Sequence, residues 1–253
     1  MSHQGTSPGP NSDARAATVI DAWASSPHRG VIFDFNGTLS DDEPLLLRIY
    51  SEMFLHHLQW TLTPRHYYAR LAGRSDREII DIIVEELADG DEALAARLLR
   101  ERRQRYCELV EQRSPILPAT VRLVRLLHDQ NVPLGIVTGA QRIDVEFVIS
   151  RSPLADVFPV IVTEEDVAHG KPEPDGFLAG AQQLGIDPAH LLAFEDSVPG
   201  VRAARAAGMR CIAVEGTRDR ATLEGEADAV TARLSPGLFG GLPAVRPLIL
   251  ENP

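Results

Sequence analysis

The sequence predicts an α/β protein in which a doubly wound parallel sheet is interrupted by one helical unit. Short apolar runs alternate with stretches of helical periodicity over most of the 253 residues, and this alternation is typical of strands joined by right-handed crossovers. One block, residues 45–114, shows helical periodicity throughout and no segment that is typical of a strand. We therefore expect a sheet core formed by residues 29–44 and 115–235, with the helical unit inserted after its first strand.

The N-terminal segment differs in composition from the strand that follows it. Residues 1–28 are rich in Ser, Gly, Pro and Ala, so we expect a mostly flexible arm, in which residues 18–23 have the pattern of a short helical turn. Residues 30–35, GVIFDF, form a short apolar run that ends at an acid, as a buried strand of a parallel sheet does.

The inserted unit is predicted to contain three helices. The first starts near residue 44, and Leu45, Ile49 and Met53 share one of its faces. The second starts at a capping box formed by Ser75 and Glu78. The third covers about residues 91–112. It carries arginines that we interpret as a solvated helix face, namely Arg97, Arg100, Arg102, Arg103 and Arg105.

Strands and helices alternate again after residue 115. Apolar runs predict strands at residues 134–138, 160–163, 191–195 and 211–214. Helical spacing predicts helices at residues 119–130, 144–150, 175–184 and 200–207. Residues 236–253 are expected to be a C-terminal tail that packs loosely on the core. Ligands bind where the carboxyl ends of parallel strands meet, so we expect Asp34, Thr138 and Asp196 to converge at one edge.

Composition and charge exclude several classes of partner. A formal net charge of −11 argues against non-specific binding to nucleic acid or to an anionic membrane surface. No apolar run approaches the roughly 20 residues of a membrane span, and the N-terminus has no secretory pattern. Two cysteines far apart in the chain, Cys107 and Cys211, do not make a disulfide framework, so we expect a cytoplasmic protein.

Two strand ends carry groups that suit phosphate chemistry. Asp34 is followed by a turn at Gly37, and an acid placed in this way can approach a metal-bound phosphate. Thr138 and Gly139 end a second strand, where a hydroxyl beside a glycine amide can hydrogen-bond phosphate oxygens. Each motif alone is equally compatible with an ordinary strand end, an Asn-Gly turn in the first case and a Thr-Gly pair in the second.

Lys171 is the only lysine in the chain, within the rigid turn GKPEP. A compact ammonium group can neutralise a nucleophile and a phosphate together, which an arginine does less well. Glu195 and Asp196 follow an apolar strand, and paired carboxylates are hard oxygen ligands that suit Mg²⁺. The alternatives are an exposed loop lysine and a solvated acidic turn.

Taken in order, the motifs DFNGTL (34–39), Thr138, GKPEP (170–174) and EDS (195–197) resemble those of the haloacid dehalogenase superfamily. The resemblance covers residues 30–215 and is specific to the branch that includes β-phosphoglucomutase and the phosphoglycolate-type phosphatases. It implies a Rossmann-like core, a helical cap at residues 45–114, and phosphoryl transfer with Mg²⁺ as the cofactor.

The resemblance also implies roles for individual residues. Asp34 is the implied nucleophile, which forms an aspartyl-phosphate, and Lys171 orders it. The implied phosphate-binding residues are Thr138, Gly139 and Lys171. The implied ligands of Mg²⁺ are Asp34, the backbone carbonyl of Asn36, Glu195 and Asp196. The cap loop that meets the rest of the substrate consists of Gly73, Arg74 and Ser75.

Asn36 departs from the family pattern, which usually has a second aspartate at this position. That aspartate protonates the leaving oxygen and later deprotonates the attacking water, and an amide can do neither. General acid–base help contributes about 10²–10⁴-fold to a rate, so Asn36 is expected to slow the hydrolysis of poor leaving groups. Three carboxylates are alternatives for this role, namely Asp41, Asp42 and Glu195.

We therefore expect a Mg²⁺-dependent phosphatase that acts on a small phosphorylated metabolite, with a sugar phosphate as the first choice. A mutase of the β-phosphoglucomutase kind is disfavoured by Asn36, because a mutase needs proton transfer at two sugar hydroxyls. A slow or non-catalytic protein that binds a phosphate-bearing ligand is the alternative from another class. The sequence gives no indication about protein partners.

Overall fold

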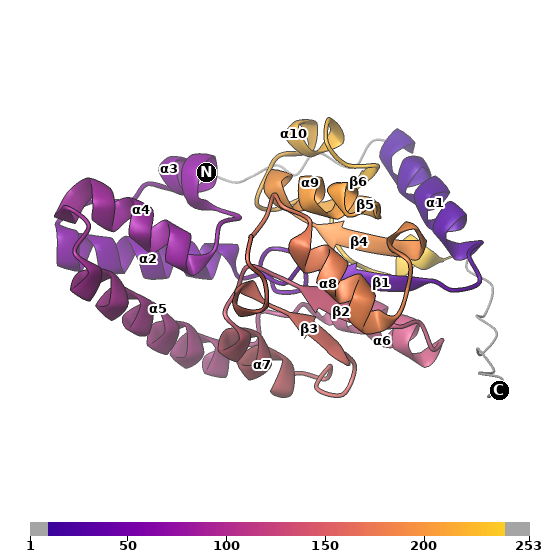
Figure 1. Cartoon of the computed structure of the whole chain (residues 1–253), viewed down its shortest axis with the longest axis horizontal. Helices are drawn as coiled ribbons and strands as arrows, with labels where there is room; N and C mark the ends of the chain where they lie inside the picture. The colour runs from indigo at the N-terminus through magenta and orange to yellow at the C-terminus, as the bar shows by residue number, and fades with distance from the viewer. Residues whose placement is uncertain (1–9, 241–253) are drawn as a thin grey trace.

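The computed structural model describes residues 10–240, which contain a six-stranded sheet with helices on both faces (Figure 1). The strands are β1 (Gly30–Phe33), β2 (Leu134–Val137), β3 (Val160–Val162), β4 (Leu191–Glu195), β5 (Arg210–Val214) and β6 (Ala229–Thr231). All neighbouring strands are parallel, and their order is β3-β2-β1-β4-β5-β6. The doubly wound parallel sheet predicted from the sequence is confirmed, with β1 between β2 and β4.

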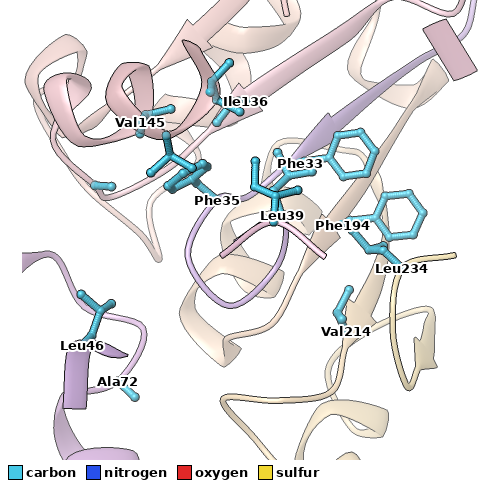
Figure 2. Packing of buried hydrophobic residues seen from close by; sticks show 14 of the residues in the cluster. Phe33, Phe35, Leu39, Leu46, Ala72, Ile136, Val145, Phe194, Val214 and Leu234 are labelled. Carbon is cyan, nitrogen blue, oxygen red and sulfur yellow. The ribbon is translucent and has the colours of Figure 1, made fainter. Parts of the chain in front are cut away.

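Helices cover the sheet on two sides because successive strand residues point to opposite faces. Val31 and Phe33 of β1 belong to the apolar cluster beneath α6 (Pro118–Asp129) and α7 (Arg142–Ser150). Ile32, between them, belongs to a second cluster beneath α8 (Asp175–Leu184) and α9 (Val198–Ala206). The rings of Phe33 and Phe194 stack at 5.3 Å between centroids, which joins β1 to β4 in the first cluster (Figure 2).

The N-terminal segment contains a helix that packs on the core. α1 spans Pro10–Ala24 and lies against β6 (Figure 1), so the expected flexible arm is wrong for this part of residues 1–28. Ile20 and Trp23 are buried, and the indole Nε1 of Trp23 donates a hydrogen bond of 2.9 Å to the carbonyl oxygen of Gly30. Residues 1–9 lie outside the described residues. Trp23 therefore ties α1 to the start of β1.

The C-terminal part of the core extends beyond the predicted boundary. A short helix, α10 (Arg220–Glu224), leads to β6, which is only three residues long and was not predicted. A 3₁₀ turn, η4 (Pro236–Phe239), follows, and the ring of Phe239 packs edge-on against Trp23 at 5.7 Å between centroids. The expected loose tail is wrong up to Gly240, because Phe239 is buried. Residues 241–253 lie outside the described residues.

The insertion between β1 and α6 has helices as its only regular elements among the described residues, which confirms the predicted helical cap. Its elements are α2 (Glu43–Leu58), α3 (Pro64–His66), the π-helical turn η1 (Tyr67–Leu71), α4 (Asp76–Ala88) and α5 (Glu92–Gln112). α5 lies against both α2 and α4, and the group stands beside the sheet in Figure 1. The capping box at Ser75 and Glu78 is present at the start of α4. No helix among residues 10–240 is long and apolar enough to cross a membrane.

The arginine-rich face of α5 is solvated except at Arg102, for which the prediction is wrong. The side chain of Arg102 is 2% exposed. Its guanidinium pairs with Asp76 of α4 at 3.0 Å and with Asp144 of α7. Buried charges of this kind are retained only when they are paired. Arg102 therefore links two cap helices to a helix of the core.

Candidate active site

The polar ends of three neighbouring strands meet at one edge of the sheet. Asp34 directly follows β1, Thr138 directly follows β2 and Asp196 directly follows β4. β2 and β4 are the two hydrogen-bonded neighbours of β1, so these side chains converge as the sequence predicts. All three are buried.

Lys171 lies at the centre of this edge, brought there by the turn before α8. Its Nζ donates hydrogen bonds to Oδ1 of Asp34 and, at 2.5 Å, to Oε1 of Glu195. Burial lowers the pKa of Lys171, but the Asp34 and Glu195 carboxylates outweigh it and raise the pKa above its ordinary value. The ammonium therefore stays charged beside Asp34. Burial raises the pKa of the Asp34 carboxyl, and Lys171 counteracts this.

Glu195 uses both of its oxygens within the protein. Oε1 accepts from Lys171, and Oε2 accepts from the Asp196 amide at 2.8 Å and from the amide and hydroxyl of Ser197 at 2.7 and 2.9 Å. A Cβ at Gly200 would lie 1.7 Å from Oε1, so glycine is required for this arrangement. Through these contacts Glu195 keeps the Lys171 side chain in position. The role of Glu195 as a metal ligand stays a prediction.

Asp34, Glu195 and Asp196 form a buried acidic cluster that a divalent cation would fit. One oxygen of each carboxylate lies within 4.8 Å of the others. Oδ2 of Asp196 is buried and has no hydrogen-bond partner among the described residues. Burial, together with the neighbouring Glu195 and Asp34 carboxylates, raises the pKa of Asp196. A cation bound by oxygen ligands would satisfy this orphaned atom and offset the repulsion.

Asn36 is held by a second buried acid. Its Nδ2 donates a hydrogen bond of 2.8 Å to Oδ2 of Asp42. The same oxygen accepts from the hydroxyls of Ser40 at 2.7 Å and Tyr106 at 2.5 Å. Because the amide nitrogen faces Asp42, the side-chain oxygen of Asn36 is left to face away from it. Asn36 can thus accept a hydrogen bond from a ligand, but it has no proton to transfer.

The predicted cap loop lies against the core at this edge. Gly73 has φ of 84°, and a Cβ there would lie 2.8 Å from Cβ of Ser197. A Cβ at Gly139 would lie 3.8 Å from Cβ of Ser75, so Gly139, which follows β2, lies close to the cap loop. In the same loop, the Nε of Arg74 donates a hydrogen bond of 3.0 Å to the carbonyl oxygen of Arg70.

One cavity of about 300 Å³ lies between the cap and the sheet edge. The residues to which the family resemblance assigns a role all line it, namely Asp34, Asn36, Gly73, Arg74, Ser75, Thr138, Gly139, Lys171, Glu195 and Asp196. Asp41 and Asp42, two of the three alternatives for the acid–base role, do not. The structure therefore brings the whole set implied by the resemblance together in one place.

Several carboxyl groups of this cavity, among them Glu43, were assigned no site role from the sequence. Glu43, the first residue of α2, is 6% exposed and lines the cavity. The phenol of Tyr67 donates a hydrogen bond of 2.9 Å to its Oε2. The available signal was the run Asp41-Asp42-Glu43-Pro44, in which an acid directly precedes a proline that starts a helix.

Comparison with known proteins identifies the family. The family model described as haloacid dehalogenase-like hydrolase matches residues 28–208, which is most of the chain. The chain belongs to this family. As a member of the haloacid dehalogenase-like hydrolases it is similar to protein CbbY of Rhodobacter capsulatus, with 33% identity over 190 residues, or 73% of this chain and 84% of the relative. It is also 33% identical over 190 residues to the fructose-1-phosphate phosphatase YqaB of Escherichia coli, or 74% of this chain and 96% of the relative.

Solved structures of the family have the same architecture. CbbY of Rhodobacter sphaeroides in complex with phosphate matches with a TM-score of 0.75 and 26% identity, covering 85% of this chain and 98% of that one. An Asp-to-Asn variant of the same protein in complex with xylulose-(1,5)bisphosphate matches with a TM-score of 0.73 and 26% identity, covering 81% and 94%.

Proposed function

We propose that this haloacid dehalogenase-like phosphatase hydrolyses a small sugar phosphate in a Mg²⁺-dependent reaction that passes through an aspartyl-phosphate on Asp34. The observation that carries the proposal is the contact of Lys171 with Asp34, in a buried cluster that also contains Asp196. A lysine that neutralises a buried carboxylate beside a candidate metal site suits attack on a phosphorus that already carries negative charge.

The side chains around the cavity have different roles in the proposed reaction. Mg²⁺, held by Asp34, Asp196 and the backbone carbonyl of Asn36, would supply positive charge next to the transferring phosphoryl group. Lys171 neutralises charge on the phosphoryl oxygens and keeps Asp34 in position. Thr138 and Gly139 at the end of β2 donate hydrogen bonds to the same oxygens. Asp34 attacks the phosphorus, and water later hydrolyses the aspartyl-phosphate.

Two observations support a small polyhydroxylated substrate. The cavity of about 300 Å³ lies at the small end of ligand pockets, and the cap loop at Gly73 and Ser75 closes one side of it. The relatives named above include a phosphatase of fructose 1-phosphate and a protein crystallised with a pentulose bisphosphate.

Phosphate release over a panel of sugar phosphates, acyl phosphates and nucleotides tests this function. We expect repeated turnover with Mg²⁺ on at least one sugar phosphate, no turnover in excess chelator, and recovery when Mg²⁺ is restored. Asp34→Asn is expected to abolish turnover while leaving the fold intact by circular dichroism. Undiminished turnover in chelator would contradict the metal assignment.

The orientation of Asn36 supports a second candidate, a slow or non-catalytic protein that binds a phosphate-bearing ligand. Its amide is fixed on Asp42 and cannot give up a proton. This candidate predicts saturable binding of phosphate with less than one turnover per site on every substrate of the panel. A mutase is distinguished in the same assay, because it would convert one sugar phosphate into another without releasing phosphate.

A further inference from the structure

The reaction needs a group that transfers a proton, and Asn36 does not provide one. A sugar alkoxide is a poor leaving group unless it is protonated as the bond to phosphorus breaks, and the water of the second step must lose a proton. A carboxyl group in the cavity, close to Asp34, is the natural candidate for both tasks.

The three carboxylates suggested by the sequence are poorly placed for this. Asp41 is exposed and does not line the cavity. Asp42 does not line it either, and its Oδ2 accepts three hydrogen bonds from the protein. Glu195 is occupied by Lys171 and by the start of α9. None of them can exchange a proton with a substrate in this arrangement.

Of the cap-side carboxyls that line the cavity, Asp76 is paired with Arg102 at 3.0 Å and with the phenol of Tyr50. Glu78 is engaged by the capping box at Ser75. Glu164 of the core turn η2 (Glu164–Asp166) also lines the cavity, and Ser75, Asp76 and Glu78 of the cap act on its pKa. Glu173, the remaining carboxyl of the lining, is exposed. Asp76 and Glu78 are thus engaged by other groups of the cap, and Glu164 is influenced by the same cap residues.

Glu43 is buried at the start of α2, where the cap leaves the core, nine residues after Asp34. It lines the cavity together with Asp34 and Asn36, and it is near enough to Asp34 for that charge to act on it. Tyr67 holds its Oε2, whereas Oε1 makes no hydrogen bond within residues 10–240. One oxygen is thus fixed and the other is available to a ligand.

We propose that Glu43 is the general acid and base of this phosphatase, in the role that Asn36 cannot take. This inference rests on the proposed function. In the first step Asp34 forms a bond to phosphorus, the bond from phosphorus to the sugar oxygen breaks, and that oxygen takes the proton of Glu43. In the second step a water oxygen bonds to phosphorus, the bond to Asp34 breaks, and Glu43 takes a proton from the water. Glu43 is protonated again at the end.

The surroundings of Glu43 favour the protonated form that the first step needs. Burial, followed by the charge of Asp42, raises the pKa of Glu43 to about 8. The hydrogen bond from Tyr67 of η1 lowers it, and the charges of Asp34 beyond β1 and Asp76 of α4 raise it. A donor with a pKa near the working pH transfers protons in both directions.

Glu43→Gln, which keeps an oxygen for Tyr67, tests the proposal against two substrate classes. With fructose 1-phosphate, or the sugar phosphate that the panel identifies, we expect kcat to fall about 10²-fold or more. With p-nitrophenyl phosphate, whose leaving group needs no proton, we expect a burst of about one nitrophenol per site followed by slow turnover. The matched control is Asp41→Asn, which is expected to retain the native rate on both substrates.

The pH profile is a readout that a merely structural role would not change. For the native protein kcat/KM on the sugar phosphate is expected to fall as the pH rises through about 8, because Glu43 loses its proton, and Glu43→Gln should remove this limb. Native rates in Glu43→Gln, or equal losses on both substrates without a burst, would overturn the proposal. Absence of turnover in the native protein would instead reject the proposed function itself.

Discussion

At the residue scale, Asn36 and Asp42 act as a pair. Asp42 is fully buried, and burial raises its pKa, while the hydrogen bonds from Ser40, Tyr106 and Asn36 lower it. A carboxylate at position 36 would face Asp42 across the present distance of 2.8 Å, and like charges at that distance cannot both ionise without a large cost. The amide at position 36 is therefore matched to the acid at position 42.

This pairing predicts the outcome of restoring the family's aspartate. Asn36→Asp alone is expected to lower the melting temperature and to raise the rate on sugar phosphates by less than about tenfold. Adding Asp42→Asn supplies an amide donor to the new carboxylate, so the double substitution should recover the melting temperature. In the Glu43→Gln background the double substitution should restore at least about tenfold of the lost rate, measured by phosphate release. Asp42→Asn alone is the control. If the double substitution restored no activity in the Glu43→Gln background, the lost rate would not be due to a defect in proton transfer.

At the element scale, α5 is the connection between cap and core. Arg102 lies on the buried stripe of α5 with Leu98 and Tyr106, spaced by four residues, and reaches Asp144 of α7. The helical spacing already places Arg102 on this stripe, but its neighbours are exposed arginines of the same type. The composition of α5 therefore suggested that all of its arginines are solvated. Only the structure shows that Arg102 has a carboxylate partner in the cap, Asp76, and another in the core, Asp144.

Arg102→Leu is expected to reduce the free energy of unfolding by about 3–5 kcal/mol, because it leaves two buried carboxylates without a counter-charge. Urea denaturation followed by circular dichroism measures the loss. Arg103→Leu, at the exposed neighbouring position, is the matched control and should stay within about 0.5 kcal/mol of the native protein. A similar small effect for both substitutions would show that the pairs of Arg102 contribute little.

The elements themselves were predictable where their pattern was long. The five strands β1 to β5 and the longer helices between them follow from period and from strand-end residues, whereas the short α3 and η1 of the cap do not. α1 was predicted only as a helical turn at residues 18–23, because residues 1–28 taken together are rich in Ser, Gly and Pro, although Ala16, Ile20 and Trp23 share one helical face. β3 is as short as β6, but it consists of three β-branched apolar residues, whereas β6 has only Ala229 and Val230 before Thr231. β6 was therefore missed, and its pairing with β5 defines it.

At the scale of the whole molecule, the fold concentrates negative charge at one edge of the sheet. The net charge of −11 is not spread evenly, since Asp34, Glu43, Asp76, Glu195 and Asp196 are all buried around one cavity that contains a single lysine. Sequence order predicted which strand ends would meet. It did not predict Glu43, because the run of acids before Pro44 indicates a helix start, and only the path of the chain from β1 into α2 brings Glu43 to the cavity.

This concentration of charge predicts that Mg²⁺ stabilises the protein without substrate. A cation that binds only the folded state at 100 times its Kd contributes about 2.7 kcal/mol, which for a chain of this size is a rise of about 5–10 °C in melting temperature. We expect this rise between excess chelator and saturating Mg²⁺ at neutral pH, measured by scanning calorimetry. Asp196→Asn should melt higher than the native protein in chelator, because one buried charge is gone, and should respond little to Mg²⁺. Equal melting temperatures of the native protein with and without Mg²⁺ would mean that the acidic cluster is neutralised by protons rather than by a cation.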